Sequence, residues 1–270
     1  MASNNGINYV LITGASSGIG YELAKIFAAN NHHLILVSRT AEDLDNVARE
    51  LKQQNNIDVV TIAKDLFEPD AAMELYDEVK NRGLNVNILV NDAGQGQHGF
   101  FADTDIDRDL EIIQLNIISL VVLTKMFLRD MLANDDGKIL QLASIASKYP
   151  APLLAVYGAT KAFVLSFSEA IANELKGTNV SITALMPGAT DTDFFNKADA
   201  ENTNQVKHDK LSDPAEVARD GYDALMNKEI KVVSGAKNKV MSAISNVMPD
   251  SANAASMRKL MEEDIDTKSN

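Results

Sequence analysis

The sequence has no cysteine, so disulfide bonds and thiolate chemistry are excluded, although the redox state of the compartment is left open. Its four histidines, His32, His33, His98 and His208, do not have the spacing of a metal site. The first six residues carry neither a basic region nor an apolar core, and no uncharged apolar run reaches the length of a membrane span. We therefore expect a cytoplasmic protein with no membrane span and no bound metal.

Positive charge is also scarce. The chain has 25 Lys and Arg against 38 Asp and Glu, which gives a formal net charge of −13. This surplus argues against nucleic acid and anionic membranes as the main partners. An anionic cofactor would need a local positive site. The length of 270 residues, the apolar content of 46% and the lack of a visible linker suit one domain over residues 1–270.

Short apolar runs alternate with stretches of helical periodicity along most of the chain. The predicted strands are 7–13, 34–38, 59–63, 88–94, 138–143, 180–186 and 230–234, and the predicted helices include 18–30, 41–54, 69–82, 107–132 and 153–176. Alternation with short connections predicts an α/β fold, a doubly wound parallel sheet of about seven strands with helices on both faces. Ligands bind at the carboxyl ends of the strands in such sheets. Polar or glycine-containing positions follow or close six of these strands, at Gly14, Arg39, Asp65, Asn91, Ser144 and Pro187.

A glycine-containing turn joins the first strand to the first helix. It reads Thr-Gly-Ala-Ser-Ser-Gly-Ile-Gly over residues 13–20. Glycines let the backbone approach a ligand closely, and a helix N-terminus offers free N–H groups and a positive dipole end to a phosphate. The pattern is consistent with a phosphate site, and a tight turn that binds nothing is the alternative.

The end of the second predicted strand bears on cofactor choice. Dinucleotide sites commonly place an acidic residue here, bonded to the adenosine 2′-hydroxyl. This chain has Ser38, Arg39 and Thr40 instead. A guanidinium binds a 2′-phosphate through two hydrogen bonds, whereas a carboxylate would repel it. We therefore predict NADP(H) rather than NAD(H), with a simple surface charge at Arg39 as the alternative.

Tyr157 and Lys161 are four residues apart, so they share one face if this part is helical. A free phenol titrates near about 10, and a neighbouring ammonium is expected to lower the pKa of Tyr157 towards neutrality. Ser144 follows the predicted strand 138–143, where its hydroxyl could hold a substrate oxygen next to the phenol. Taken alone, the Tyr-x-x-x-Lys spacing also fits a solvated helix pair.

Two later segments stand apart from this alternation. The stretch 189–212 is polar except for Phe194 and Phe195, and we predict a substrate flap over the site, with an ordinary surface loop as the alternative. A C-terminal helical extension at about 237–265 follows. Its apolar residues recur at helical spacing and predict a core or subunit contact, a membrane-surface helix being the lesser alternative. These residues are Val240, Met241, Ile244, Val247 and Met248.

Together these motifs resemble those of the short-chain dehydrogenase/reductase family, over roughly residues 7–235. The matching positions are residues 13–20, Asp65-Leu66, Asn-Asp-Ala-Gly at 91–94, Asn116, Ser144, Tyr157-x-x-x-Lys161 and Pro187-Gly188. The resemblance implies a Rossmann-like fold and an NADP(H)-dependent oxidoreductase that transfers a hydride between nicotinamide and a carbonyl or hydroxyl carbon. One departure is Asp92, where the family usually has asparagine, and it puts the geometry of this turn in doubt.

The resemblance also implies roles for single residues. Tyr157 would be the general acid/base, Lys161 would lower its pKa and hold the nicotinamide ribose, and Ser144 would bind the substrate oxygen. Asn116 would anchor a water chain that reaches Lys161. Cofactor binding would fall to Gly14, Ser16, Ser17, Gly18, Ile19, Ser38, Arg39, Thr40, Asp65, Leu66, Asn91, Ala93, Gly94, Tyr157, Lys161, Pro187, Gly188, Thr190 and Thr192. Among these, Asp65 would bond the adenine amine, Asn91 would line the adenosine side, and Thr190 and Thr192 would contact the nicotinamide amide.

Several questions stay open at this point. A non-catalytic protein that binds NADP(H) as a redox signal is the main alternative, and a sugar-nucleotide epimerase of the same superfamily usually needs a longer chain. The substrate, a small carbonyl or alcohol, is not identified. Candidate lining residues are Gln95, Gln97, His98, Phe100, Tyr149, Phe194 and Phe195. The helices at 107–132 and 153–176 form subunit contacts in the family, so a homodimer or homotetramer is expected.

Overall fold

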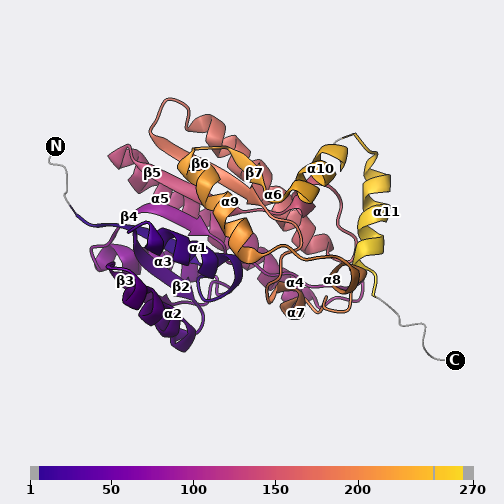
Figure 1. Cartoon of the computed structure of the whole chain (residues 1–270), viewed down its shortest axis with the longest axis horizontal. Coiled ribbons are helices and arrows are strands. Elements are labelled where there is room, and N and C mark those ends of the chain that lie inside the picture. Colours follow the sequence, from indigo (N-terminus) through magenta and orange to yellow (C-terminus); the bar gives the residue numbers. More distant parts are fainter. Residues whose placement is uncertain (1–5, 246, 264–270) are drawn as a thin grey trace.

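The computed structural model describes residues 6–245 and 247–263, and its centre is one parallel sheet (Figure 1). The seven strands lie in the order β3-β2-β1-β4-β5-β6-β7, and every neighbouring pair is parallel. The strands are β1 Asn8–Thr13, β2 His33–Ser38, β3 Val59–Ala63, β4 Asn85–Asn91, β5 Gly137–Leu142, β6 Val180–Met186 and β7 Lys231–Val233. The predicted Rossmann-like sheet with helices on both faces is therefore confirmed.

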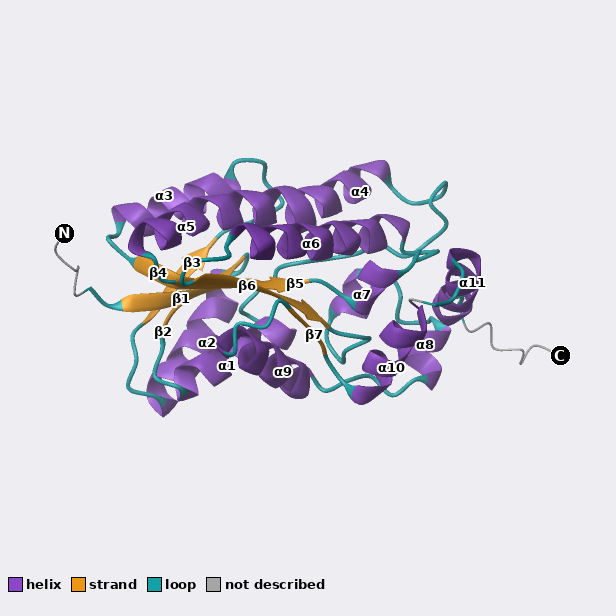
Figure 2. Cartoon of the chain, turned by 90° about the horizontal axis from the view of Figure 1, so that it is seen from above, coloured by secondary structure: helices purple, strands orange, loops and turns teal. Residues whose placement is uncertain are grey.

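Helices cover the two faces of the sheet as two separate layers (Figure 2). One layer holds α1 Gly18–Ala29, α2 Ala41–Gln54 and α9 Pro214–Met226. The other holds α3 Ala71–Asn81, α4 Ile106–Ile113, α5 Leu120–Asn134 and α6 Ala155–Glu174. Further helices gather beyond the carboxyl ends of the strands, namely α7 Phe194–Lys197, α8 Asn204–His208, α10 Ala236–Ser245 and α11 Asp250–Met261 (Figure 2).

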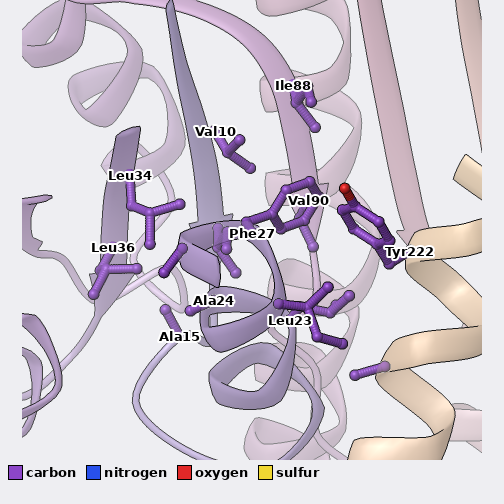
Figure 3. Packing of buried hydrophobic residues seen from close by; sticks show 14 of the residues in the cluster. Val10, Ala15, Leu23, Ala24, Phe27, Leu34, Leu36, Ile88, Val90 and Tyr222 are labelled. Atoms are coloured by element: carbon purple, nitrogen blue, oxygen red, sulfur yellow. The ribbon is translucent and has the colours of Figure 1, made fainter. Parts of the chain in front are cut away.

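Both faces of the sheet are buried because the strands carry apolar side chains on both sides. Neighbouring side chains on a strand point to opposite faces, and in β1 both sets are apolar. Val10 packs into the core under α1, whereas Leu11 packs into the core under α5. Figure 3 shows the first of these cores, where the ring of Phe27 on α1 meets that of Tyr222 on α9 edge to face, with centroids 5.1 Å apart. The sheet is packed on both faces, so the carboxyl ends of its strands are held in fixed positions.

A continuous helix runs from Ile106 to Asn134 through α4, a π-helical segment η1 Gln114–Ser119, and α5. By length and composition it could cross a membrane, with a mean hydropathy of 1.7 in its most apolar window. In the structure, however, Leu115, Leu123 and Phe127 pack into the core on the sheet. Its place on the sheet accounts for part of this apolar character, since 44% of that window is buried, and the absence of a membrane span stays a prediction.

Two expectations are corrected by the structure. The predicted strand 88–94 begins at Asn85 and ends at Asn91, because residues 92–94 turn away from the sheet to pass the glycine turn. The apolar stripe of the C-terminal extension is not core, since Val240, Ile244 and Val247 are exposed. Helix α10 instead buries polar residues, and Asn238 donates a hydrogen bond from Nδ2 to Ser234 O at 2.8 Å. A subunit contact by this stripe stays a prediction.

Candidate active site

A cavity of about 310 Å³ opens at the carboxyl ends of strands β1 to β6. The residues that follow each of these strands line it, as the strand-end argument predicted. Among the residues predicted to form the site, Asn91 and Asn116 do not line the cavity, and all the others do. The topology therefore brings together side chains that are up to 178 positions apart in the chain, from Gly14 to Thr192.

The glycine turn forms one end of the cavity. Gly14 and Gly18 have φ values of +70° and +56°, which favour glycine. A Cβ on Gly20 would lie 2.5 Å from the carbonyl oxygen of Gly14, so a side chain does not fit there. Ser17 is the N-cap of α1 but makes no side-chain hydrogen bond to its first turn. Open N–H groups at a helix N-terminus beside a glycine cradle fit the pyrophosphate of a dinucleotide.

Beside this turn, the end of β2 carries the predicted selectivity residues. The buried hydroxyl of Ser38 has no hydrogen-bond partner in the described part of the chain. The guanidinium of Arg39 lies over the ring of Phe67, 5.5 Å from its centroid. Phe67 is itself placed by Asp65, whose Oδ1 accepts a hydrogen bond from Phe67 N at 3.1 Å. An unsatisfied hydroxyl and a positioned guanidinium at one spot suit a phosphate on the adenosine ribose.

The central part of the cavity is built by β5 and α6. Lys161 is buried, and its Nζ donates a hydrogen bond to Leu142 O at 2.7 Å while lying 5.8 Å from the centroid of the Tyr157 ring. Ser144 follows β5, and its hydroxyl lies next to the Tyr157 phenol, where it favours the ionised form. A second serine, Ser147, donates from Oγ to Lys161 O at 2.8 Å and ties α6 to this strand end. The predicted triad therefore meets in one place.

The electrostatics of this triad correct one expectation. Burial raises the pKa of Tyr157 to about 12, and the nearby Ser144 hydroxyl opposes this rise. Burial lowers the pKa of Lys161 to about 8. The predicted lowering of the tyrosine pKa by Lys161 is therefore wrong for the free protein, because the loss of solvent outweighs the only opposing contribution, which comes from Ser144. Tyr157 is protonated at neutral pH, as a free phenol is, and burial extends this state to higher pH.

Asp92 occupies the position where the sequence departs from the family pattern that it resembles. The pKa of its carboxyl is raised to about 7 by burial, against the opposing pull of the Lys161 charge and a hydrogen bond from the backbone of Gly20. A Cβ on Gly14 would lie 2.9 Å from Asp92 Oδ2. Asp92 N also donates to Thr13 Oγ1 at 3.1 Å. The acid thus joins the end of β4 to the glycine turn, and the geometry of this turn is kept.

Two predicted residues face elsewhere. The side chain of Asn91 is buried below the cavity floor, where its Nδ2 donates to Thr124 Oγ1 at 3.1 Å and to Gln141 Oε1 at 3.0 Å. Asn116 donates from Nδ2 to Gln95 O at 2.9 Å and to Thr160 Oγ1 at 3.0 Å. It thereby fastens the loop after β4 to helix α6. Neither residue lines the cavity, and the adenosine role predicted for Asn91 and the water chain predicted for Asn116 stay predictions.

The remaining part of the cavity is lined by the later segments. Of the residues proposed to line a substrate site, Gln95, Phe194 and Phe195 do so, whereas Gln97, His98, Phe100 and Tyr149 do not. The ring of Phe194 lies 4.9 Å from that of Tyr157. Sequence reasoning missed further lining residues, among them Leu154, Gln205, Met257 and Met261. The only signal for the last two was the spacing of two methionines by one helical turn.

Comparisons with known proteins agree with this geometry. A sequence model of the short chain dehydrogenase family matches residues 8–203. The very-long-chain 3-oxoacyl-CoA reductase of Bos taurus is 33% identical over 185 residues, which are 66% of this chain and 58% of that protein. Dehydrogenase/reductase SDR family member 7B of Mus musculus is 30% identical over 232 residues, which are 83% of this chain and 72% of that protein.

Solved structures extend the likeness to almost the whole chain. A short-chain dehydrogenase from Sphingobium yanoikuyae, in complex with NADPH, has a TM-score of 0.80 at 27% identity and covers 97% of this chain and 98% of its own. The 3-oxoacyl-CoA reductases, in contrast, are matched over only about 58% of their length. On the family match, the shared fold and the site at the strand ends, this chain belongs to the short-chain dehydrogenase/reductase family of oxidoreductases.

Proposed function

We propose that this chain is an NADP(H)-dependent oxidoreductase that transfers a hydride between nicotinamide and the carbonyl or hydroxyl carbon of a small molecule. The observation that carries the proposal is the meeting of Ser144, Tyr157 and Lys161 in the same cavity as the glycine turn. A binding module would need the turn, but it would have no use for a buried phenol and ammonium at the far side of it.

The residues of the chain suit the reduction direction. When bound, NADPH supplies a hydride to the carbonyl carbon. Tyr157, whose pKa is raised by burial, then donates its proton to the carbonyl oxygen, while the Ser144 hydroxyl holds that oxygen by a hydrogen bond. Lys161 is fixed to Leu142 O and places its charge beside the phenol, where it stabilises the phenolate that forms.

Preference for NADP(H) over NAD(H) is part of the proposal. It is supported by Arg39 at the end of β2, by the unpartnered hydroxyl of Ser38, and by the NADPH complex of the Sphingobium yanoikuyae protein. No acidic side chain replaces Arg39 at the position that follows β2. A guanidinium there can bind a phosphate through two charge-assisted hydrogen bonds, whereas a ribose hydroxyl is uncharged and offers a weaker contact.

Substitution of Tyr157 by phenylalanine tests the reaction directly. The Tyr157→Phe variant keeps the ring against Phe194 but loses the proton donor, so turnover of carbonyl compounds should fall about a thousandfold. The dissociation constant for NADPH should stay unchanged. Tyr149→Phe is the matched control, since Tyr149 is close to Tyr157 but does not line the cavity. Unchanged turnover in Tyr157→Phe would defeat the assignment.

The comparisons lend no support to the redox-sensor alternative, since the similar proteins described above are reductases or dehydrogenases. We further propose that the chain acts in the cytoplasm as a homodimer or homotetramer. The exposed apolar residues Leu110, Ile118 and Phe163 on the outer helical layer support the second point. Cell fractionation tests the first.

A further inference from the structure

We infer that the substrate carries a bulky, uncharged apolar group next to its reacting carbonyl, and that Met257 and Met261 on helix α11 help to select it. The inference rests on the proposed reductase function. It concerns the part of the cavity that residues of α7, α8 and α11 line beside Tyr157.

The wall of this part is apolar and well packed. Met257 and Met261 are one helical turn apart, so both point from α11 to the same side. They are 6% and 1% exposed and form one cluster with Leu154, against which the ring of Tyr157 packs. Phe194 and Phe195 of α7 complete the lining. Methionine adapts to irregular apolar shapes, which suits contact with a hydrocarbon or aromatic group.

Within the described residues, the charged side chains that α7, α8 and α11 contribute to this wall form a single ion pair. The charged side chains that α7 and its N-cap contribute to the lining are Lys197 and Asp193, and they bind each other at 2.9 Å. Helix α8 contributes Gln205, and α11 contributes only the two methionines. A carboxylate or phosphate on the substrate would lose its water here without gaining an unpaired cation.

Helix α11 is held in place by contacts that do not depend on a ligand. His98 donates from Nε2 to Met261 O at 2.6 Å, and the guanidinium of Arg258 lies over the ring of Phe100 at 5.3 Å. From α8, Asn204 donates its backbone N–H to Glu262 O at 2.9 Å and its Nδ2 to Lys259 O at 3.0 Å. The methionines are therefore fixed parts of the wall.

This wall lies beyond the part of the chain that the family model covers. The model match ends at residue 203, before Met257 and Met261, whereas the Sphingobium yanoikuyae structure aligns with 97% of this chain. The glycine turn, Ser144, Tyr157 and Lys161 all lie inside the model match. The part that the family model covers thus supplies the chemistry, while α11 supplies a surface whose residues the model does not fix.

A homologous series of methyl alkyl ketones tests the inference, with NADPH oxidation followed by absorbance and pyruvate as a small charged carbonyl. We expect kcat/KM to rise about three- to fourfold for each added methylene until the wall is filled. Pyruvate should react about a hundredfold less well than the best ketone. A rate that does not depend on chain length, or that favours pyruvate, would overturn the inference and leave the reductase function standing. No oxidation of NADPH by any carbonyl compound would instead defeat the proposed function.

Substitutions in α11 provide a second test of the inference. Met257→Asn and Met261→Asn place an amide in the apolar wall and should raise KM for the longest ketone about tenfold, with the dissociation constant for NADPH unchanged. Met261→Leu should keep the wild-type behaviour. Met226→Asn on α9, outside the cavity, is the matched control. Equal KM values in all four variants, with helix content unchanged by circular dichroism, would remove the methionines from substrate selection.

Discussion

At the scale of single residues, the site depends on which ionisable side chains are buried and which are exposed to solvent. Burial raises the pKa of Tyr157, whereas the Arg39 side chain is exposed and lies over the ring of Phe67. A sequence shows which ionisable groups are present, but it does not show how much water each one loses on folding. That is why the direction of the Tyr157 pKa was predicted wrongly while the position of its side chain was predicted correctly.

Reversal of charge at Arg39 should exchange the cofactor preference. In Arg39→Asp, a carboxylate repels the 2′-phosphate and can accept a hydrogen bond from a 2′-hydroxyl, so the dissociation constant for NADPH should rise about a hundredfold while that for NADH falls. Fluorescence titration of both cofactors measures this. Arg49→Asp, the same change on the exposed face of α2, is the control for net charge. An unaltered preference would show that the end of β2 does not select the cofactor.

Asp92 should make the stability of the protein depend on pH. The pKa of its carboxyl is raised from 3.8 to about 7 in the folded state, so the folded protein binds a proton that the unfolded chain has already released. The contribution of this group to stability therefore falls as pH rises from about 4 to about 7. In Asp92→Asn this fall disappears, and the variant should gain on the wild type across that range. Urea unfolding at several pH values measures the difference, and parallel curves would contradict it.

At the scale of helices and strands, local patterns were sufficient for the sheet and insufficient for the C-terminal extension. The strands 59–63 and 180–186 agree residue by residue with the prediction because apolar runs between turns leave little choice. Helix α10 shows the opposite case, since its apolar stripe faces outward and its polar side is buried. The burial of Asn238 depends on Gly188, whose missing side chain leaves room for the amide. The contact joins residues far apart in the sequence, so a local sequence pattern does not predict it.

The segment 189–212 offers a prediction at this scale. Its ends are held together, since Asp191 N donates to Ser212 O and Ser212 N donates to Ala189 O, both at 2.9 Å, while Thr192 lies against Gly18 of the glycine turn. If it acts as a flap, its amide hydrogens should exchange faster than those of the sheet, and NADPH should slow them. Hydrogen exchange with mass spectrometry measures this, with α3 as the internal control because it lines no part of the cavity. Exchange as slow as in the sheet, with or without NADPH, would show a fixed loop.

At the scale of the whole molecule, one helical layer has a partly apolar outer surface. Leu110 and Ile118 on the long helix, and Phe163 on α6, are 55%, 45% and 39% exposed. Both helices lie in the same layer, on the side of the sheet away from α1 and α9. Apolar residues gathered on one face of a chain favour association with a second copy.

We expect light scattering after gel filtration to give a multiple of the 29.3 kDa chain mass. Phe163→Glu should convert the assembly to single chains, because it places a charge in the contact. Ile230→Glu makes the same kind of change at an exposed apolar residue before β7 and should have no effect. A wild-type protein that elutes as one chain would remove the predicted contact.

The placement of helix α11 has a practical consequence for handling the protein. β1 starts at Asn8, at the amino ends of the strands, whereas α11 lies beyond their carboxyl ends (Figure 1). Met261, the last residue of α11, lines the cavity. An affinity tag or surface tether joined at the front of the chain would sit far from the reacting groups. An attachment at the rear follows the methionine-bearing helix in the chain, so the two fusions should differ in their kinetics even where they are equally pure.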